Sequence, residues 1–217
     1  YYSDATGEYE IYLLENKKGA KAKQVTFGSS AWMYDAKWSP DSKYMLFFDR
    51  TLKLKCLNVE SGEVKIVDVA RRNEITDFSF SPDSKWIAYV KDSNNDQGAV
   101  WVYNITTGKN YHLTDDTFGD SSPVFSKDGN FIFFLSNLDF NLDFSSFEFD
   151  YLYNNATRIF AMSLKADGPK LFALKNDVEE VKEYKTAVDE KKKVKKVEPK
   201  VEKAEANVES DKIKTDA

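Results

Sequence analysis

The chain has 217 residues, of which 41% are apolar and 15% aromatic, and this is enough for one large domain with a sizeable core. No apolar run approaches the roughly 18 residues of a membrane-spanning helix, and the first residues lack the pattern of a signal peptide. The net charge is −5 and no basic face is apparent, so nucleic acid is not expected as a partner. The single cysteine, Cys56, excludes an internal disulfide framework and is expected as a small buried side chain.

The last fifth of the chain differs in composition from the rest. Residues 175–217 contain 12 lysines and 12 acidic side chains, with one aromatic residue, Tyr184. Such a segment buries too little apolar surface to offset the entropy of ordering it. We therefore predict that residues 175–217 are a charged low-complexity linker, either disordered or a lone solvated helix, and that residues 1–174 are the folded part.

Three similar hexads recur in the folded part, and their starts are 42 and 45 residues apart. They are residues 38–43 (WSPDSK), 80–85 (FSPDSK) and 125–130 (FSKDGN). After each hexad comes a strand-like run, and after the first two an alternating strand, a glycine-bearing turn and a short further strand follow. Each period therefore contains four strands.

The hexad has the composition of a tight turn between two of these strands. Proline fixes φ for the second turn position, and the aspartate that follows can accept hydrogen bonds from backbone N–H groups. Four antiparallel strands in a period of this length are typical of a β-propeller blade, whereas a β-sandwich would not keep a fixed period.

We predict an all-β fold, a partial β-propeller of about three and a half blades. Two strands in residues 9–15 and 21–27 would be followed by blades at residues 31–69, 75–113 and 120–174. A closed ring has about four blades or more, so this set is expected to be an incomplete ring.

The last of these blades contains a long insertion. Residues 136–156 separate its second and third strands and are rich in aromatic side chains. Propellers place binding or interdomain contacts on such rim segments, although the segment could equally pack its aromatic residues on its own blade. Paired guanidiniums in the link between two blades could bind a peptide carboxylate. The candidates for peptide or interdomain contacts are therefore Arg71, Arg72, Phe140, Phe144 and Phe147.

Catalytic chemistry has little support in the residues. His112 is the one histidine, and its place in a short outer strand favours a surface or half-buried role over that of a general base. Residues 92–98 resemble a calcium loop only in part, because the glycine is one position late and the twelfth position is Tyr103. We expect no catalytic residue, no cofactor and no metal site.

A family resemblance adds to this interpretation. Residues 74–89 resemble a blade of the tricorn-type serine peptidases. A succession of motifs resembles the second β-propeller of tricorn homologues just before a charged connector: 133–137 (FFLSN), 140–141 (FN), 147–151 (FEFDY), 156–160 (ATRIF) and 164–169 (LKADGP). The Ser-Pro-Asp turn is shared by many propellers, so the insertion is the more specific part of the likeness.

The resemblance implies a non-catalytic propeller segment of a serine endopeptidase, which gates or channels peptides to a separate proteolytic domain. It implies peptide substrates, contacts with other domains of the same chain, a homo-oligomer, and a cytoplasmic location, with the periplasm or secretion as alternatives. Two other functions stay open at this point. One is the propeller of a prolyl-oligopeptidase-like enzyme, and the other is a TolB-like protein-binding propeller without enzyme activity.

Overall fold

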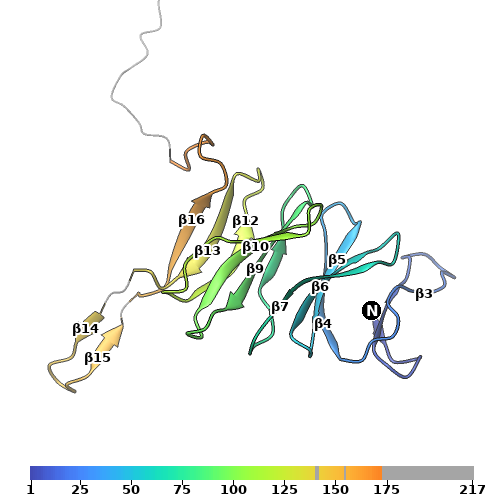
Figure 1. Cartoon of the computed structure of the whole chain (residues 1–217), viewed down its shortest axis with the longest axis horizontal. Coiled ribbons are helices and arrows are strands. Elements are labelled where there is room, and N and C mark those ends of the chain that lie inside the picture. Colours follow the sequence, from blue (N-terminus) through green and yellow to red (C-terminus); the bar gives the residue numbers. More distant parts are fainter. Residues whose placement is uncertain (140–141, 154, 173–217) are drawn as a thin grey trace, which may run out of the picture. The chain divides into compact units, whose positions relative to one another are not determined.

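The described part of the computed structural model consists of β-strands joined by turns and loops (Figure 1). It comprises residues 1–139, 142–153 and 155–172, so the prediction for residues 175–217 lies outside the described residues. Residues 1–171 form one compact unit. No helix of this described part is long and apolar enough to cross a membrane.

The strands pair with their neighbours in the chain. In order they are β1 (Tyr2–Ser3), β2 (Glu10–Leu13), β3 (Lys23–Gln24), β4 (Met33–Trp38), β5 (Tyr44–Asp49), β6 (Lys53–Asn58), β7 (Val64–Val69), β8 (Phe78–Phe80), β9 (Trp86–Asp92), β10 (Gly98–Asn104), β11 (Lys109–His112), β12 (Asp120–Phe125), β13 (Phe131–Ser136), β14 (Leu142–Phe144), β15 (Tyr151–Tyr153) and β16 (Arg158–Ser163).

These strands form four successive antiparallel sheets and one separate hairpin. The first sheet has the order β1-β2-β3, the second β4-β5-β6-β7, the third β8-β9-β10-β11 and the fourth β12-β13-β16. Strands β14 and β15 pair only with each other among the described strands. The second and third sheets are thus complete four-stranded blades, as the repeat predicts.

The two outer sheets differ in detail from the prediction. The first sheet has three strands instead of two, because the two-residue β1 pairs with the start of β2. No apolar alternation marks so short a strand, so the sequence pattern could not show it. The fourth sheet has three strands among the described residues, with β16 at its edge.

The repeated hexad forms the same turn in the second and third sheets. Ser81 Oγ donates to Asp83 Oδ1 at 2.6 Å and accepts from the backbone N–H of Trp86 at 2.9 Å. Ser39 makes the corresponding bonds to Asp41 and Tyr44. The fifth residue of each hexad has a positive φ, which glycine supplies in the fourth sheet and serine in the other two. The predicted turn chemistry is confirmed.

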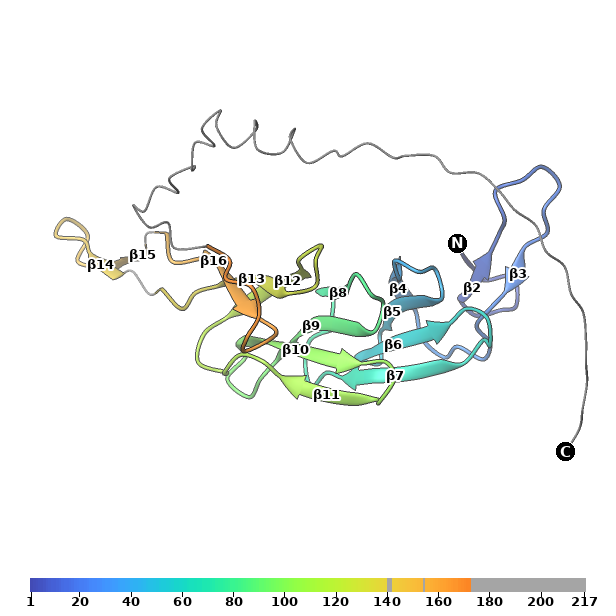
Figure 2. The ribbon, with the colours of Figure 1, turned by 90° about the horizontal axis from the view of Figure 1, so that it is seen from above.

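Hydrogen bonds between successive sheets repeat the period of the sequence. The backbone N–H of Asp41 donates to Ser84 Oγ at 3.1 Å, across 43 residues. Asn110 Nδ2 in β11 donates to the carbonyl of Val67 in β7 at 3.0 Å, also across 43 residues, and these strands lie close together in Figure 2. Ser79 Oγ donates to the carbonyl of Pro123 at 2.8 Å, across 44 residues. Equivalent positions of successive repeats therefore stand next to one another.

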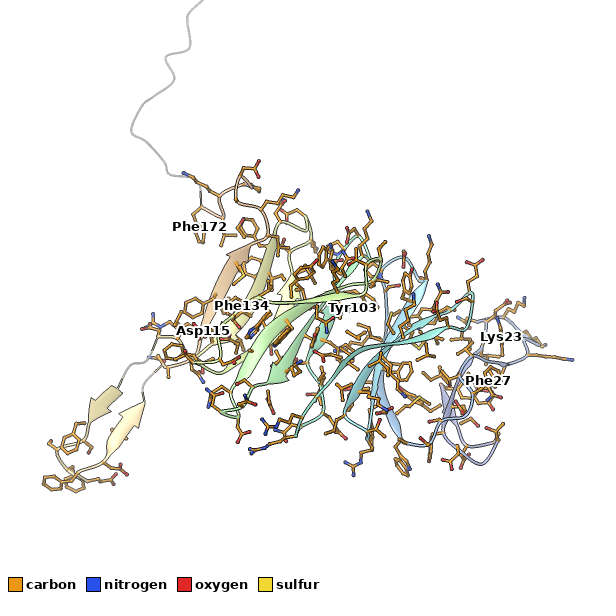
Figure 3. The ribbon with its side chains drawn as sticks, in the orientation of Figure 1. Lys23, Phe27, Tyr103, Asp115, Phe134 and Phe172 are labelled. Atoms are coloured by element: carbon orange, nitrogen blue, oxygen red, sulfur yellow. The ribbon has the colours of Figure 1, made fainter. Side chains whose placement is uncertain are left out.

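The core is divided into three clusters, one at each junction between sheets. The largest contains Leu46 and Tyr103 and joins the second and third sheets, where Figure 3 shows Tyr103 among neighbouring side chains. A second cluster around Phe47 joins the first and second sheets. A third around Ile132 and Phe134 joins the third and fourth. Each sheet thus obtains its burial from its neighbours.

The buried turn serine provides a test of this arrangement. Ser81 is 3% exposed, and Ser81→Ala removes both the acceptor for the Trp86 N–H and the donor to Asp83. We expect the free energy of unfolding to fall by about 1–2 kcal/mol, measured by urea denaturation. The exposed Ser30→Ala is the control and should change it by less than about 0.5 kcal/mol. Equal losses for the two variants would contradict the assigned role of the turn.

The lowered pKa values of the turn aspartates predict that the protein loses stability at acidic pH. The Ser126 hydroxyl, followed by Asn130, lowers the pKa of Asp128 from 3.8 to about 2, and the Ser81 hydroxyl lowers that of Asp83. Because the folded state holds these protons less tightly, their contribution is complete above about pH 4 and is lost as the pH falls toward about 2. The melting temperature should fall in that window, and Asp128→Asn should reduce the fall.

Candidate functional site

The order of the strands brings several loops to one edge of the sheets. In an antiparallel sheet with strands in chain order, the connection between the second and third strands leaves from the same edge as the connection to the next sheet. Here these connections are residues 70–77, 93–97, 113–119 and 137–157. We call this rim, which lies at the ends of the strands and not along an outer strand, the loop edge. It contains the described members of the contact candidates predicted from the sequence.

Arg71 and Arg72 contact the neighbouring turn of the third sheet. The Arg71 guanidinium donates to the amide oxygen of Asn94, and the Arg72 guanidinium forms an ion pair with Asp96. The side chains of Arg72 and Asp96 are both more than half exposed. The two guanidiniums thus have different partners, and a peptide carboxylate would have to share or replace these contacts.

A cavity of about 230 Å³ lies beside Arg71 on the loop edge. Its lining residues are Val69, Arg71, Lys91, Asp92, Ser93, Asn94, Trp101 and Asp116. The Lys91 ammonium is held 2.7 Å from Asp68 Oδ2 and 4.3 Å from the centre of the Trp101 ring. The Tyr89 hydroxyl also donates to Asp68 Oδ2, at 2.7 Å. The cavity therefore has a charged wall whose side chains are held by partners, next to an aromatic ring.

Burial raises the pKa of the Tyr89 phenol, and the hydrogen bond to Asp68 raises it further. The phenol therefore stays protonated and donates to the carboxylate over the whole physiological range of pH. Asp68 is thus shared by a neutral donor and by the Lys91 ammonium. This arrangement fixes the position of Lys91 at the wall of the cavity.

His112 completes the same group of side chains. Its ring stacks on Trp101 with the ring centres 4.2 Å apart, and its Nε2 lies 3.2 Å from Asp116 Oδ1. These partners are an aromatic ring and a carboxylate, so His112 is held by a ring stack and by a polar contact with Asp116. Its side chain is 33% exposed, which agrees with the predicted half-buried place on an outer strand.

A second cavity of about 480 Å³ lies at the base of the insertion. It is lined by Gln97, Thr117, Phe118, Gly119, Asn137, Ala156 and Thr157. Thr157 Oγ1 donates to Asn137 Oδ1 at 2.6 Å, and the Asn137 N–H donates to the Gly119 carbonyl at 3.2 Å. The two ends of the insertion are therefore tied to each other and to the preceding connection.

The insertion itself contains the hairpin of β14 and β15. Phe140 lies outside the described residues, whereas Phe144 is 58% and Phe147 89% exposed. The sequence left open whether the aromatic residues of this segment make contacts or pack on their own blade. Phe147 does not pack on its blade, because its ring faces solvent.

Sequence analysis did not predict a groove of about 600 Å³ between the third and fourth sheets. Its apolar side chains are Trp86, Val102, Tyr111, Leu113, Phe125 and Leu164. At the corresponding place between the second and third sheets, Tyr103 and Ile105 leave only about 50 Å³. In β16 the register aligns Met162 with the place of Tyr103. The pairing of strands reveals this difference, because it shows which residue of β16 stands in the place of Tyr103.

No group of three or more histidine, cysteine, aspartate or glutamate side chains in the described part of the chain is arranged to hold a metal ion. The turn at residues 92–98 is closed instead by its own hydrogen bonds. The Ser93 N–H and hydroxyl both donate to the carbonyl of Gln97 at 2.9 Å. The segment therefore has the form of a polar hairpin turn.

Comparison with known protein families shows to which family this chain belongs. The family model described as the tricorn protease second beta propeller domain matches residues 1–215. This chain belongs to that family. The matched region includes the charged segment from residue 175 onward as well as the four sheets, and it decides the family in favour of tricorn over the two alternatives left open by the sequence.

Individual relatives agree with this assignment. The tricorn protease of Thermoplasma volcanium is 32% identical over 139 residues, which cover 61% of this chain and 14% of the relative. Tricorn protease homolog 1 of Streptomyces coelicolor is 27% identical over 154 residues, covering 71% of this chain and 14% of the relative. This chain therefore spans about 14% of the length of these proteins.

The fold is also that of a tricorn structure. A crystal structure of the tricorn protease superposes with a TM-score of 0.64 at 19% identity, over 70% of this chain and 15% of that chain. Together with the four successive antiparallel sheets, this likeness confirms the predicted partial β-propeller.

The buried thiol offers a test of the packing between the second and third sheets. Cys56 is 4% exposed, and burial raises the pKa of its thiol to about 12. Because the thiolate is the reactive form, the native protein should resist alkylation by iodoacetamide at neutral pH. Mass spectrometry should find Cys56 modified only after denaturant is added. Rapid alkylation of the native protein would show that this junction opens.

Proposed function

We propose that this chain is a non-catalytic propeller segment of a tricorn-like serine peptidase and guides extended peptides toward a proteolytic domain outside this segment. The observation that carries the proposal is membership of the second-propeller family, combined with four sheets that pack in series. The contacts of His112, a ring and a carboxylate, support a structural role for the one histidine.

The packing of the sheets suits a wall along which chains are sorted. Hydrogen bonds and apolar clusters join each sheet to the next, so the wall is stiff and folded proteins would be excluded by size. An extended peptide could reach the loop edge, where Arg71 and Arg72 offer guanidiniums and the two cavities offer room for side chains. Peptide carboxylates would bind the guanidiniums by charge-assisted hydrogen bonds.

The wider setting of the proposal comes from the relatives named tricorn protease. The parent protein would be a serine endopeptidase that acts on peptides, and this propeller would contact other domains of the same chain. The peptidase would be a homo-oligomer in the cytoplasm. Phe144 and Phe147, together with the two arginines, are the proposed positions for contacts with peptides or domains.

The test uses the full-length protein and two substrates of different length. Arg71→Glu with Arg72→Glu should lower kcat/KM for a long unfolded polypeptide by about fivefold to tenfold, because the peptide carboxylate would meet like charge. Turnover of a blocked tetrapeptide should stay within about twofold, since such a short substrate needs no guidance along the wall. Steady-state kinetics with both substrates measures the difference.

The control reverses two charges at the opposite edge of the sheets. Lys109→Glu with Lys127→Glu makes the same change in net charge at two exposed positions, the start of β11 and a turn, and should leave both substrates unaffected. If both double variants changed the two substrates equally, a general effect of charge would explain the result. If neither changed the long substrate, the guiding role of the loop edge would be wrong.

A further inference from the structure

The β14–β15 hairpin stands apart from the four sheets in its bonding. Asp143 pairs with Leu152 and Phe144 with Tyr151, and the described strands include no third strand for this sheet (Figure 1). A two-stranded hairpin alone is marginally stable in water, because one of its faces cannot be buried. Such an element gains most when a second surface covers it.

The tip of the hairpin exposes an unusual amount of aromatic surface. Phe147 is 89% and Phe149 78% exposed, and Leu152 in β15 is 46% exposed. The rings of Phe144 and Phe149 meet edge to face with their centres 6.4 Å apart. Exposed apolar side chains grouped in this way mark interaction sites more often than scattered single residues do.

Hydrogen bonds from Ser145 give the tip a defined conformation. The Ser145 N–H donates to the Asp150 carbonyl at 2.8 Å, and the Ser145 carbonyl accepts from the Phe149 N–H at 3.0 Å. The Ser145 hydroxyl oxygen accepts from the N–H of Glu148 at 3.2 Å and from that of Phe147 at 3.4 Å. The loop between the strands is therefore closed by its own bonds, and its side chains are presented outward.

Phe149 has a backbone conformation that bulky residues rarely adopt. Its φ is +54°, in the left-handed region that favours glycine. Glycine at this position would relieve the strain, yet the chain has a large aromatic side chain there, and that side chain faces solvent. An unfavourable backbone that projects an exposed ring is typical of residues kept for a contact.

The charge of the insertion indicates what kind of surface it fits. Residues 137–157 contain the four acidic residues Asp139, Asp143, Glu148 and Asp150, and they contain no lysine or arginine. Glu148 stands between the exposed Phe147 and Phe149. Asp139 lies outside the tip and pairs with Arg158 at 2.5 Å. A complementary surface would combine an apolar pocket with lysine or arginine side chains at its border.

We propose that this hairpin is a docking arm whose Phe147 and Phe149 rings insert into an apolar pocket bordered by basic side chains on another domain of the full-length protein. Glu148 forms the ion pair at the border of the pocket. Because Ser145 already holds the tip in shape, little further ordering is required on docking. The location of the pocket rests on the proposed function, since it assumes a parent protein with further domains.

The experiment places a photo-cross-linking amino acid, p-benzoyl-phenylalanine, at position 147 of the purified full-length protein. The control places it at Phe27, which is 75% exposed in a loop of the first part of the chain. We expect a discrete cross-link from position 147, with a yield about tenfold above the control, to a site outside residues 1–172 that has lysine or arginine nearby. Peptide mapping by mass spectrometry identifies the site.

Two further variants test the role of charge. Glu148→Lys should lower the cross-link yield by about tenfold, and Glu148→Gln by less, because only the first brings like charge to the pocket. Glu148 is exposed, so neither variant should change the melting temperature. A cross-link that maps to residues 1–172, in the same copy or in a second copy identified by the doubled mass, would overturn docking on another domain. Diffuse cross-links equal to those from position 27, or no effect of Glu148→Lys, would overturn the docking arm.

This experiment is independent of peptide turnover. A discrete cross-link with unchanged peptide kinetics in the Arg71 and Arg72 variants would support the docking arm and refute guidance along the loop edge. The reverse result would refute the arm alone. The two proposals can therefore fail separately.

Discussion

Leu46 and Tyr103 belong to different sheets and share one buried cluster, and the same kind of contact joins each of the four successive sheets to its neighbour. A sheet with two apolar faces is stable only when both are covered, so the sheets depend on their packing in series. Where the described residues include no further sheet, apolar side chains such as Val124 and Ile159 stay exposed. Burial between sheets is the constraint on which the turns, the loops and the cavities depend.

This packing explains why the polar residues of the repeat recur. A turn that ends one strand also meets the turn of the next sheet, as the Asp41 N–H does with Ser84 Oγ. The hexad is thus both a local turn and part of the contact between sheets. The cross-sheet bonds span 43 or 44 residues, close to the spacings of 42 and 45 residues between the hexads.

The proposed contact positions lie where this regularity is interrupted. At the loop edge, Lys91 is held by Asp68 and Trp101 beside a cavity, in the place where the second sheet has the ion pair of Lys55 with Asp49. The fourth sheet replaces a short connection with a hairpin that has its own strands and an exposed aromatic tip. The blades form the regular support, and the departures from the repeat are concentrated in the loops and in the insertion.

The sequence by itself determined the all-β class, the period, the turn chemistry and the position of the insertion, because these follow from local alternation and from residues such as Pro82 and Gly129. It could not show that Arg71 and Arg72 contact Asn94 and Asp96, or that His112 stacks on Trp101. It also missed β1 and the groove beside β16. The arginine contacts and the groove arise where sheets of different repeats pack together, whereas β1 and the His112 stack arise from pairing within one sheet. Both kinds of contact depend on distances in space that neighbouring residues in the sequence do not encode.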